Sequence, residues 1–323
     1  MRPMNTFSVQ APSAVVMVRP HHFESNPQTA ADNAYQRAHT QDSSGAIAQR
    51  AYREVSLAAE TLATHGVRVH LLEDTHADRT PDSVFPNNWF STHAGGHVAL
   101  YPMYSPNRRL ERRQDVLELL KAEYRVQDII DYSGLEADGL FLEGTGAMVL
   151  DHISRVAYTV RSNRANAIAL ERFATHFNFE PLVFDAADAG QRAVYHTNVL
   201  MCVGTAFAMG GFEMIGDAAR RAEVRNRLAE PGRDIIDLTQ AQVAEFAGNA
   251  LELSGSAGRI LALSARAMLS LTRAQKQCIE RSATLVPLVV PTIELAGGSV
   301  RCMLAGIHLA ARPVTKPVMR PAP

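Results

Sequence analysis

The sequence predicts an α/β protein folded as one domain. Short β-branched runs alternate with helical patterns from one end of the chain to the other, and no Pro/Ser-rich linker divides it. The elements group roughly five times as strand, strand, helix, strand, without recognisable sequence repeats between the groups. We therefore expect a single domain over residues 13–310, with flexible termini at residues 1–12 and 311–323.

The elements expected in the first half begin with the β-branched run at residues 14–19, which predicts a strand. A helical pattern covers residues 45–65, and a second strand-like run follows at residues 67–72. Further short apolar runs predict strands at residues 83–89, 97–102, 147–151 and 156–159.

The second half is expected to begin with a helix over residues 163–177, capped by Ser162 and the Asn163 amide. Apolar runs then predict strands at residues 181–184, 196–203, 207–209, 234–238, 251–253, 259–263, 285–291 and 300–308. Helical patterns lie between these runs at residues 217–228, 241–247 and 272–282. This order continues the repeated grouping of strand, strand, helix and strand.

Composition is that of an ordinary globular protein. Of 323 residues, 46% are hydrophobic and 20% charged, and 32 basic side chains nearly balance 33 acidic ones. This balance gives no electrostatic footprint for nucleic acid or an acidic membrane. The longest apolar stretch, residues 285–296, is interrupted by Pro287, Pro291 and Glu294 and is shorter than the roughly 20 residues of a membrane span. Residues 1–20 lack the apolar core of a secretory signal, so we expect a cytoplasmic protein, with homo-oligomerisation compatible with this composition.

The three cysteines do not form a recognisable framework. Cys202, Cys278 and Cys302 are odd in number, far apart and without a C-x-x-C pair, which argues against structural disulfides or a thiolate zinc site. We interpret Cys202 and Cys278 as apolar core thiols. His93 and His97 enclose two glycines and are better interpreted as flanking a hairpin turn than as a zinc pair. No metal or organic cofactor is therefore expected.

Three short motifs contain residues that could carry chemistry. Cys302 follows the Gly297-Gly298 pair, His196 opens an apolar run, and Glu143 lies between a hydrophobic segment and a glycine turn. Taken singly, each also fits a structural role: a core thiol, a satisfied strand histidine and a surface acid. The glycines after Glu143 do not make a dinucleotide-binding fingerprint, because Val149 occupies the place of the third glycine.

A fourth motif, residues 82–89, combines Asp82, two consecutive amides and the only tryptophan of the chain. Paired asparagines normally indicate a turn. Asn87 and Asn88, however, stand between apolar, strand-like residues, where their amides must find partners or face a ligand.

In this order the motifs resemble the amidinotransferase-like, or pentein, superfamily, which includes arginine deiminase, dimethylarginine dimethylaminohydrolase and arginine dihydrolases. Its members carry a Glu-Gly turn, then a His on a strand, then a Cys after Gly-Gly, as Glu143, His196 and Cys302 do here. Residues 161–163 resemble the Arg-Thr-Asn motif of the dimethylaminohydrolases, and residues 18–26 resemble the citrulline-utilisation hydrolases. The resemblance spans about residues 14–309 and implies a five-bladed α/β propeller of ββαβ units.

The resemblance also implies roles for these residues in the hydrolysis of a guanidino or ureido amino acid. Cys302 would attack the guanidino or ureido carbon, and His196 would act as general acid and base. Glu143 would orient His196 or bind the terminal nitrogens. Arg161 would hold the substrate carboxylate, and Asp82 the α-amino group.

Two departures from the family pattern bear on the substrate. Deiminase-type enzymes carry an aspartate for the guanidinium where this chain has Asn87 and Asn88, and an amide suits a neutral ureido group equally well. This predicts hydrolysis of arginine or citrulline as far as ornithine, carbon dioxide and ammonia. Some relatives also place a carboxylate-binding Arg before a proline, where Tyr101 stands here, so Arg108 or Arg109 is a candidate replacement.

Three alternatives remain open at this point. A deiminase or dimethylarginine dimethylaminohydrolase would stop at citrulline, and an amidinotransferase would use the same Cys-His pair to pass the amidino group to an amine. A binding protein on the same architecture, like the ribosome-associated initiation factor that shares it, would have no reason to keep Cys302, His196 and Glu143 in one pocket.

Overall fold

The computed structural model describes residues 9–30, 32–37, 44–74 and 80–313. The described chain forms five sheets of three strands each. In every sheet the first two strands are antiparallel, the second and third are parallel, and a helix connects the parallel pair. A parallel pair needs such a crossover because its strands run in the same direction. The α/β class is therefore confirmed, and the sheets match repeated ββαβ units.

Four units follow one another along the chain. The first consists of β3 (Phe90–His93), β4 (His97–Leu100), α2 (Gln114–Glu123) and β5 (Asp128–Asp131). The second consists of β6 (Met148–Asp151), β7 (Val156–Val160), α4 (Ala167–Phe177) and β8 (Glu180–Phe184). The third consists of β9 (Met201–Val203), β10 (Phe207–Gly210), α6 (Ala218–Ala229) and β11 (Asp234–Asp237). The fourth consists of β12 (Leu251–Gly255), β13 (Gly258–Ser264), α8 (Ala265–Ser270), α9 (Arg273–Glu280) and β14 (Thr284–Leu288).

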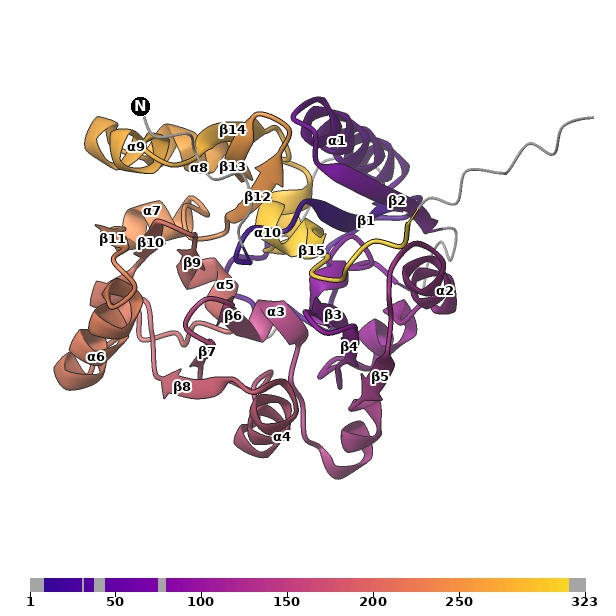
Figure 1. The fold of residues 1–323 in the computed structure, drawn as a ribbon, viewed down its shortest axis with the longest axis horizontal. Coiled ribbons are helices and arrows are strands. Elements are labelled where there is room, and N and C mark those ends of the chain that lie inside the picture. Colours follow the sequence, from indigo (N-terminus) through magenta and orange to yellow (C-terminus); the bar gives the residue numbers. More distant parts are fainter. Residues whose placement is uncertain (1–8, 31, 38–43, 75–79, 314–323) are drawn as a thin grey trace, which may run out of the picture.

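The fifth unit joins the two ends of the described chain. It consists of β15 (Ala305–Gly306), β1 (Ala14–Pro20), α1 (Ser44–Thr64) and β2 (Arg68–Asp74). Strand β15 pairs antiparallel with β1, Val15 opposite Gly306 and Val16 opposite Ala305. Figure 1 shows the units following one another around a common centre, with the last unit made of indigo and yellow segments.

Short helical turns precede the first strands of four units. They are η1 (Pro86–Asn88), α3 (Gly144–Ala147), α5 (Thr197–Leu200) and α10 (Val300–Met303). Turn α3 contacts both η1 and α5, and α10 contacts η1, so these turns meet near the common centre of the units. The chain also contains η2 (Pro106–Glu111), η3 (Ser133–Asp138), η4 (Phe212–Met214), α7 (Gln240–Ala244) and η5 (Ile293–Ala296).

These turns correct three predicted strands. Residues 83–89 form turns and η1, residues 197–200 of the run 196–203 form α5, and residues 300–303 of the run 300–308 form α10. A short apolar run does not by itself distinguish a buried strand from a buried helical turn. In all three cases tertiary packing selects the helical turn, so the strand prediction was wrong there.

Other boundaries also differ from the prediction. Helix α4 begins at Ala167 rather than residue 163, and its cap is Asn166, whose side chain accepts a hydrogen bond from the Ile168 amide. Helices α2 and α8 and strand β5 were not predicted. The N-terminal segment is folded from residue 9: Gln10 is buried, and its side chain donates to the carbonyls of Leu150 and Val203 at 3.0 Å each. The expectation of flexibility for residues 1–8 and 314–323 lies outside the described residues.

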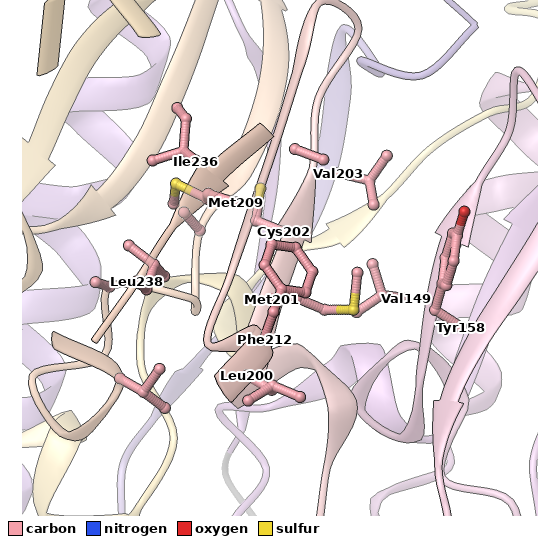
Figure 2. Packing of buried hydrophobic residues seen from close by; sticks show 14 of the residues in the cluster. Val149, Tyr158, Leu200, Met201, Cys202, Val203, Met209, Phe212, Ile236 and Leu238 are labelled. Carbon is pink, nitrogen blue, oxygen red and sulfur yellow. The ribbon is translucent and has the colours of Figure 1, made fainter. Parts of the chain in front are cut away.

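The hydrophobic core lies between neighbouring units and beneath the helices. Figure 2 shows part of the largest cluster, where the Met201 side chain of β9 is directed toward Val149 of the second unit. Cys202 is buried in the same cluster, as expected, whereas Cys278 is only partly buried against it. None of the helices in the described part of the chain is both long and apolar enough to cross a bilayer.

Candidate active site

A cavity with about 270 Å³ of empty space, including the part open to solvent, lies among the short central turns. Asp82, Asn88, His196 and Cys302, four residues that the sequence analysis connects with catalysis or substrate binding, line it. The other lining residues are Thr29, Asn33, Phe85, Arg108, Arg164, Tyr195, Ala296 and Gly298. Side chains separated by more than two hundred positions in the chain therefore meet in one concave site, which we call the catalytic cavity.

Glu143 and His196 form a buried pair beside this cavity. Each residue precedes a helical turn, Glu143 before α3 and His196 before α5, and Oε2 of Glu143 lies 2.9 Å from Nε2 of His196. Burial lowers the pKa of His196, and the Glu143 carboxylate opposes part of this shift. Burial alone would raise the pKa of Glu143, but Arg164, His196 and Arg108 outweigh it and hold that pKa well below its usual value. Glu143 is therefore an anion that orients a mainly neutral imidazole.

Two buried arginines compensate the Glu143 charge. Arg164 Nη1 lies 3.3 Å and Arg108 Nη1 lies 3.7 Å from Glu143 Oε2. Arg164 also binds Asp32, with Nε 3.1 Å from Oδ2, and Arg108 binds Glu111, with Nε 3.0 Å from Oε1. Buried charges are stable only when they are paired in this way.

Cys302 lies in α10 behind the Gly297-Gly298 turn. A Cβ on Gly298 would come within 2.8 Å of the Phe85 ring and 3.3 Å of the Cys302 Cβ, so only glycine allows the turn to pass this closely. The Nδ2 atoms of Asn198 and Asn249 each lie 3.3 Å from the Cys302 Sγ. Two side-chain amides from different segments therefore point at one sulfur and fix its position in the site.

Asp82 and Asn88 line the other side of the cavity. Asn26 Nδ2 donates to Asp82 Oδ2 at 2.8 Å, while Asp82 Oδ1 is buried without a protein partner. Burial raises the pKa of Asp82, an effect that Arg108 opposes. In the amide orientation that satisfies both of its ends, the Asn88 oxygen accepts from Arg108 Nη1 at 2.8 Å and its nitrogen donates to Asn87 Oδ1 at 3.1 Å. The Asn87 Nδ2 is buried without a partner, so an unused N–H donor remains at this end of the site.

The structure separates Arg161 and Arg109 from this site. The Arg161 side chain is 62% exposed, pairs with Asp185 at 3.2 Å and lines a different surface pocket. Arg109 donates to the Met103 carbonyl at 3.1 Å and does not line the catalytic cavity. Of the arginines considered from sequence, only Arg108 lies in the cavity.

Sequence reasoning missed four residues of the site. Arg164, Asn198, Asn249 and Tyr195 carried no separate signal, because their roles depend on contacts between distant segments. Arg164 stands three positions after Arg161, and Asn198 two positions after His196, so each lies beside a motif that had been recognised. Tyr195 donates its hydroxyl to the Gly297 carbonyl at 2.7 Å and thereby ties the His196 segment to the turn before Cys302.

A metal centre is not indicated by the side chains. Within the described ranges, no group of three or more His, Cys, Asp or Glu residues is arranged to hold a metal ion. His93 and His97 flank a hairpin turn, as predicted, because they pair with each other where β3 meets β4. Nδ1 of His97 lies 2.6 Å from Oδ1 of Asp128.

Solved structures with the same fold act on, or are bound to, arginine derivatives. The N-terminal domain of ArgZ, described as an arginine dihydrolase from the ornithine-ammonia cycle in cyanobacteria and solved with substrate bound, has a TM-score of 0.70. It is 18% identical, and the match covers 91% of this chain and 97% of that chain. Unliganded AgrE gives a TM-score of 0.72 at 18% identity, covering 93% of this chain but only 40% of that chain.

A dimethylarginine hydrolase shares the fold at greater distance. The DDAH of Pseudomonas aeruginosa, solved as a mutant complexed with citrulline, has a TM-score of 0.61 at 13% identity, covering 92% of this chain and 100% of that chain. At these identities the matches demonstrate the fold alone. A search of curated protein sequences finds no match.

A family model identifies the chain more directly. The model described as "N,N dimethylarginine dimethylhydrolase, eukaryotic" matches residues 19–309, which is most of the chain and includes every residue of the catalytic cavity. The chain therefore belongs to this family, within the amidinotransferase, or pentein, superfamily.

Proposed function

We propose that the protein hydrolyses carbon–nitrogen bonds of a guanidino or ureido amino acid through a covalent intermediate on Cys302. The observation that carries this proposal is that Cys302 and His196 line one cavity, with His196 held at 2.9 Å by the buried Glu143. A nucleophile, a base and a residue that orients the base are the parts that covalent hydrolysis requires. A protein that only binds a ligand needs none of them.

The proposed reaction begins as the neutral His196 imidazole takes the proton of the Cys302 thiol, and the resulting thiolate attacks the guanidino carbon. Because Glu143 engages Nε2 of His196, Nδ1 is the ring nitrogen available to the reacting group. His196 protonates the departing nitrogen, ammonia leaves, and a thiouronium-type adduct remains on the sulfur. Water then adds to that carbon as His196 takes its proton, and the carbon–sulfur bond breaks to return the thiolate. The product of this first cycle is a ureido compound.

Charges around the cavity suit the amino-acid end of such a substrate. Arg108 and Arg164 both line it and are placed to neutralise a carboxylate, and the unpartnered Asp82 Oδ1 is an acceptor for an α-ammonium group. This assigns the carboxylate to Arg164 or Arg108 in place of Arg161, whose exposed side chain lies in another pocket.

Asn88 favours a reaction that continues through the ureido stage. An amide at this position can accept from or donate to a neutral ureido group, whereas a carboxylate would prefer the cationic guanidinium. ArgZ, described as an arginine dihydrolase and solved with substrate, with product and covalently bound to a reaction intermediate, has the same fold. We therefore propose arginine or citrulline as substrate, with ornithine, carbon dioxide and ammonia as products.

A substrate panel tests this proposal. Ornithine, citrulline, ammonia and dimethylamine should be quantified after incubation with arginine, citrulline or N,N-dimethylarginine. Ornithine with two equivalents of ammonia from arginine, and one from citrulline, is the expected result. Accumulation of citrulline would instead identify a deiminase or a dimethylaminohydrolase, and product formation only with an added amine acceptor would identify an amidinotransferase.

We also infer that the five units are the blades of a five-bladed α/β propeller forming one catalytic domain. The shared strand order, the arrangement around a common centre and the pairing of β15 with β1 support this inference. Such a ring brings together the short turns before the first strands of four units, where the catalytic cavity lies.

A further inference from the structure

A second cavity runs between the first strands of the units. It has about 600 Å³ of empty space, including the part open to solvent, and shares no lining residue with the catalytic cavity. Its walls come from β3, β6, β9 and β15, from the start of β12, and from the N-terminal segment at Gln10 and Pro12. We call it the central cavity.

Apart from the Cys202 thiol, the ionisable side chains that line the central cavity are basic. Arg301, His152 and His308 line it, and no aspartate or glutamate does. Within the described part of the chain, no carboxylate forms an ion pair with Arg301, whose Nη1 donates only to the Leu304 carbonyl at 2.9 Å. Arg301 is half-buried and differs in this from the buried arginines Arg108, Arg164 and Arg233, each of which faces a carboxylate. A guanidinium stays charged in either setting, so Arg301 presents to the cavity a positive charge that no side chain lining it compensates.

Two histidines lie against the same space. The His152 and His308 rings stack with centroids 3.9 Å apart and an interplanar angle of 23°. Burial and the nearby Arg301 lower the pKa of His308 to about 4, and burial with the neighbouring His308 and His93 lowers the pKa of His152. An anion bound near Arg301 and the two histidine rings would offset the repulsion between their positive charges. It would also accept hydrogen bonds from the ring N–H groups.

A metal ion fits this arrangement poorly. Stacked imidazole rings present their faces, not their nitrogens, to one another, and the described residues hold no set of three or more His, Cys, Asp or Glu side chains suited to a metal. Cys202 also lines the cavity, but burial raises its pKa to about 12, which keeps the thiol neutral. The side chains that line the central cavity therefore suit an anionic ligand better than a metal cation.

We propose that the central cavity binds a small inorganic oxyanion, held by the Arg301 guanidinium and flanked by the stacked His152 and His308 rings. The planar fork of a guanidinium matches two oxygens of an oxyanion, and the enclosing strands leave room for a compact ligand. The site is distinct from the catalytic cavity, and the inference does not depend on the proposed hydrolysis.

Nuclear magnetic resonance of the full chain tests the site directly, with inorganic phosphate as the probe and sodium chloride at matched ionic strength as the control. The imidazole nitrogen signals of His152 and His308 should shift saturably with phosphate. The signal of His97, whose partly exposed ring is bound to Asp128, should not. Signals of His152 and His308 that do not move, or that move equally with chloride, would overturn the proposal without requiring any variant.

Calorimetric titration of variants locates the binding further. Arg301→Gln should weaken phosphate binding roughly tenfold or more, the loss expected for a charge-assisted hydrogen bond. Arg281→Gln, which changes an exposed arginine paired with Asp234, is the matched control and should leave the affinity unchanged. Arg164→Gln tests the catalytic cavity: if it abolishes phosphate binding while Arg301→Gln does not, the anion binds there and the proposal is wrong.

Discussion

The side chain of Asn249 lies 3.3 Å from the sulfur of Cys302 and connects two neighbouring units at the catalytic cavity. Asn249 precedes β12, and Cys302 lies in the turn before β15. The same Nδ2 donates to the Asn198 carbonyl at 2.9 Å, and the Asn249 oxygen accepts from the Arg301 amide at 3.0 Å. The nucleophile is thus positioned by an amide that is itself fixed at both ends.

The first prediction concerns the reactivity of Cys302. Asn249→Ala removes the amide that positions the sulfur, so alkylation of Cys302 by iodoacetamide should slow roughly tenfold at neutral pH. The measurement requires a background in which Cys202 and Cys278 are replaced by serine. Asn226→Ala changes an exposed asparagine of α6 and should leave the rate unchanged. Equal alkylation rates in both variants would show that Asn249 does not control the reactivity of Cys302.

The second prediction concerns the pH dependence of turnover. Glu143 raises the pKa of His196 against the effect of burial, so Glu143→Gln should lower that pKa further. Protonated His196 is the form that donates to the departing nitrogen, and it is lost as pH rises through its pKa. The alkaline limb of the kcat profile should therefore move to lower pH, with a fall in kcat of about 10²-fold.

A matched control separates this effect from a general loss of charge. Glu213→Gln alters a largely exposed carboxylate bound to Arg221 and should leave both kcat and the limb in place. If Glu143→Gln lowered kcat without moving the limb, Glu143 would act on the substrate and not through His196.

The third prediction concerns the close approach at Gly146. A Cβ there would lie 2.9 Å from the His196 ring at both Nδ1 and Cε1, and would also collide with the Asn88 amide. Gly146→Ala should therefore displace His196 and reduce kcat at least about tenfold, since misplacement of about 1 Å can cost a hundredfold. In Gly134→Ala the added Cβ meets nothing within 4 Å, so activity should persist. Equal activity in both variants would show that the position of His196 tolerates change.

The fourth prediction concerns the end point of the reaction. Asn88→Asp would place a carboxylate where the Asn88 oxygen accepts from Arg108, which favours a cationic guanidinium over a neutral ureido group. Incubated with arginine, this variant should accumulate citrulline at the expense of ornithine, as measured by chromatography. Asn166→Asp, at the half-buried N-cap of α4 where aspartate also caps, should keep the product ratio. An unchanged ratio of citrulline to ornithine in Asn88→Asp would show that Asn88 does not determine the product.

The general arrangement of the chain could be predicted from sequence because it depends on local patterns. The β-branched run at β1, the amphipathic helix α1 and the strand β7 lie where those patterns place them. The turns that carry Asn88 and Cys302 could not be recognised, because their apolar residues fit a buried strand equally well. Only packing among the central turns decides between the two.

The candidate site was predictable in part for a similar reason. Glu143, His196 and Cys302 lie beside glycines or at the start of apolar runs, and such positions can be read along the chain. Arg164 and Asn249 act through contacts with residues far away in sequence, which one chain without its fold does not reveal. Arg161 matches a family motif but is exposed on the surface, whereas Arg164, three positions later, lines the cavity.

Loss of activity in Cys302→Ser tests the central claim most directly. A hydroxyl is a far weaker nucleophile than a thiolate at neutral pH, so ornithine and citrulline release should be abolished while the circular dichroism spectrum stays that of the unmodified protein. Cys278→Ser, at a partly exposed thiol outside the cavity, is the matched control and should retain full activity. Turnover by Cys302→Ser equal to that of Cys278→Ser would contradict a mechanism through covalent attack by Cys302.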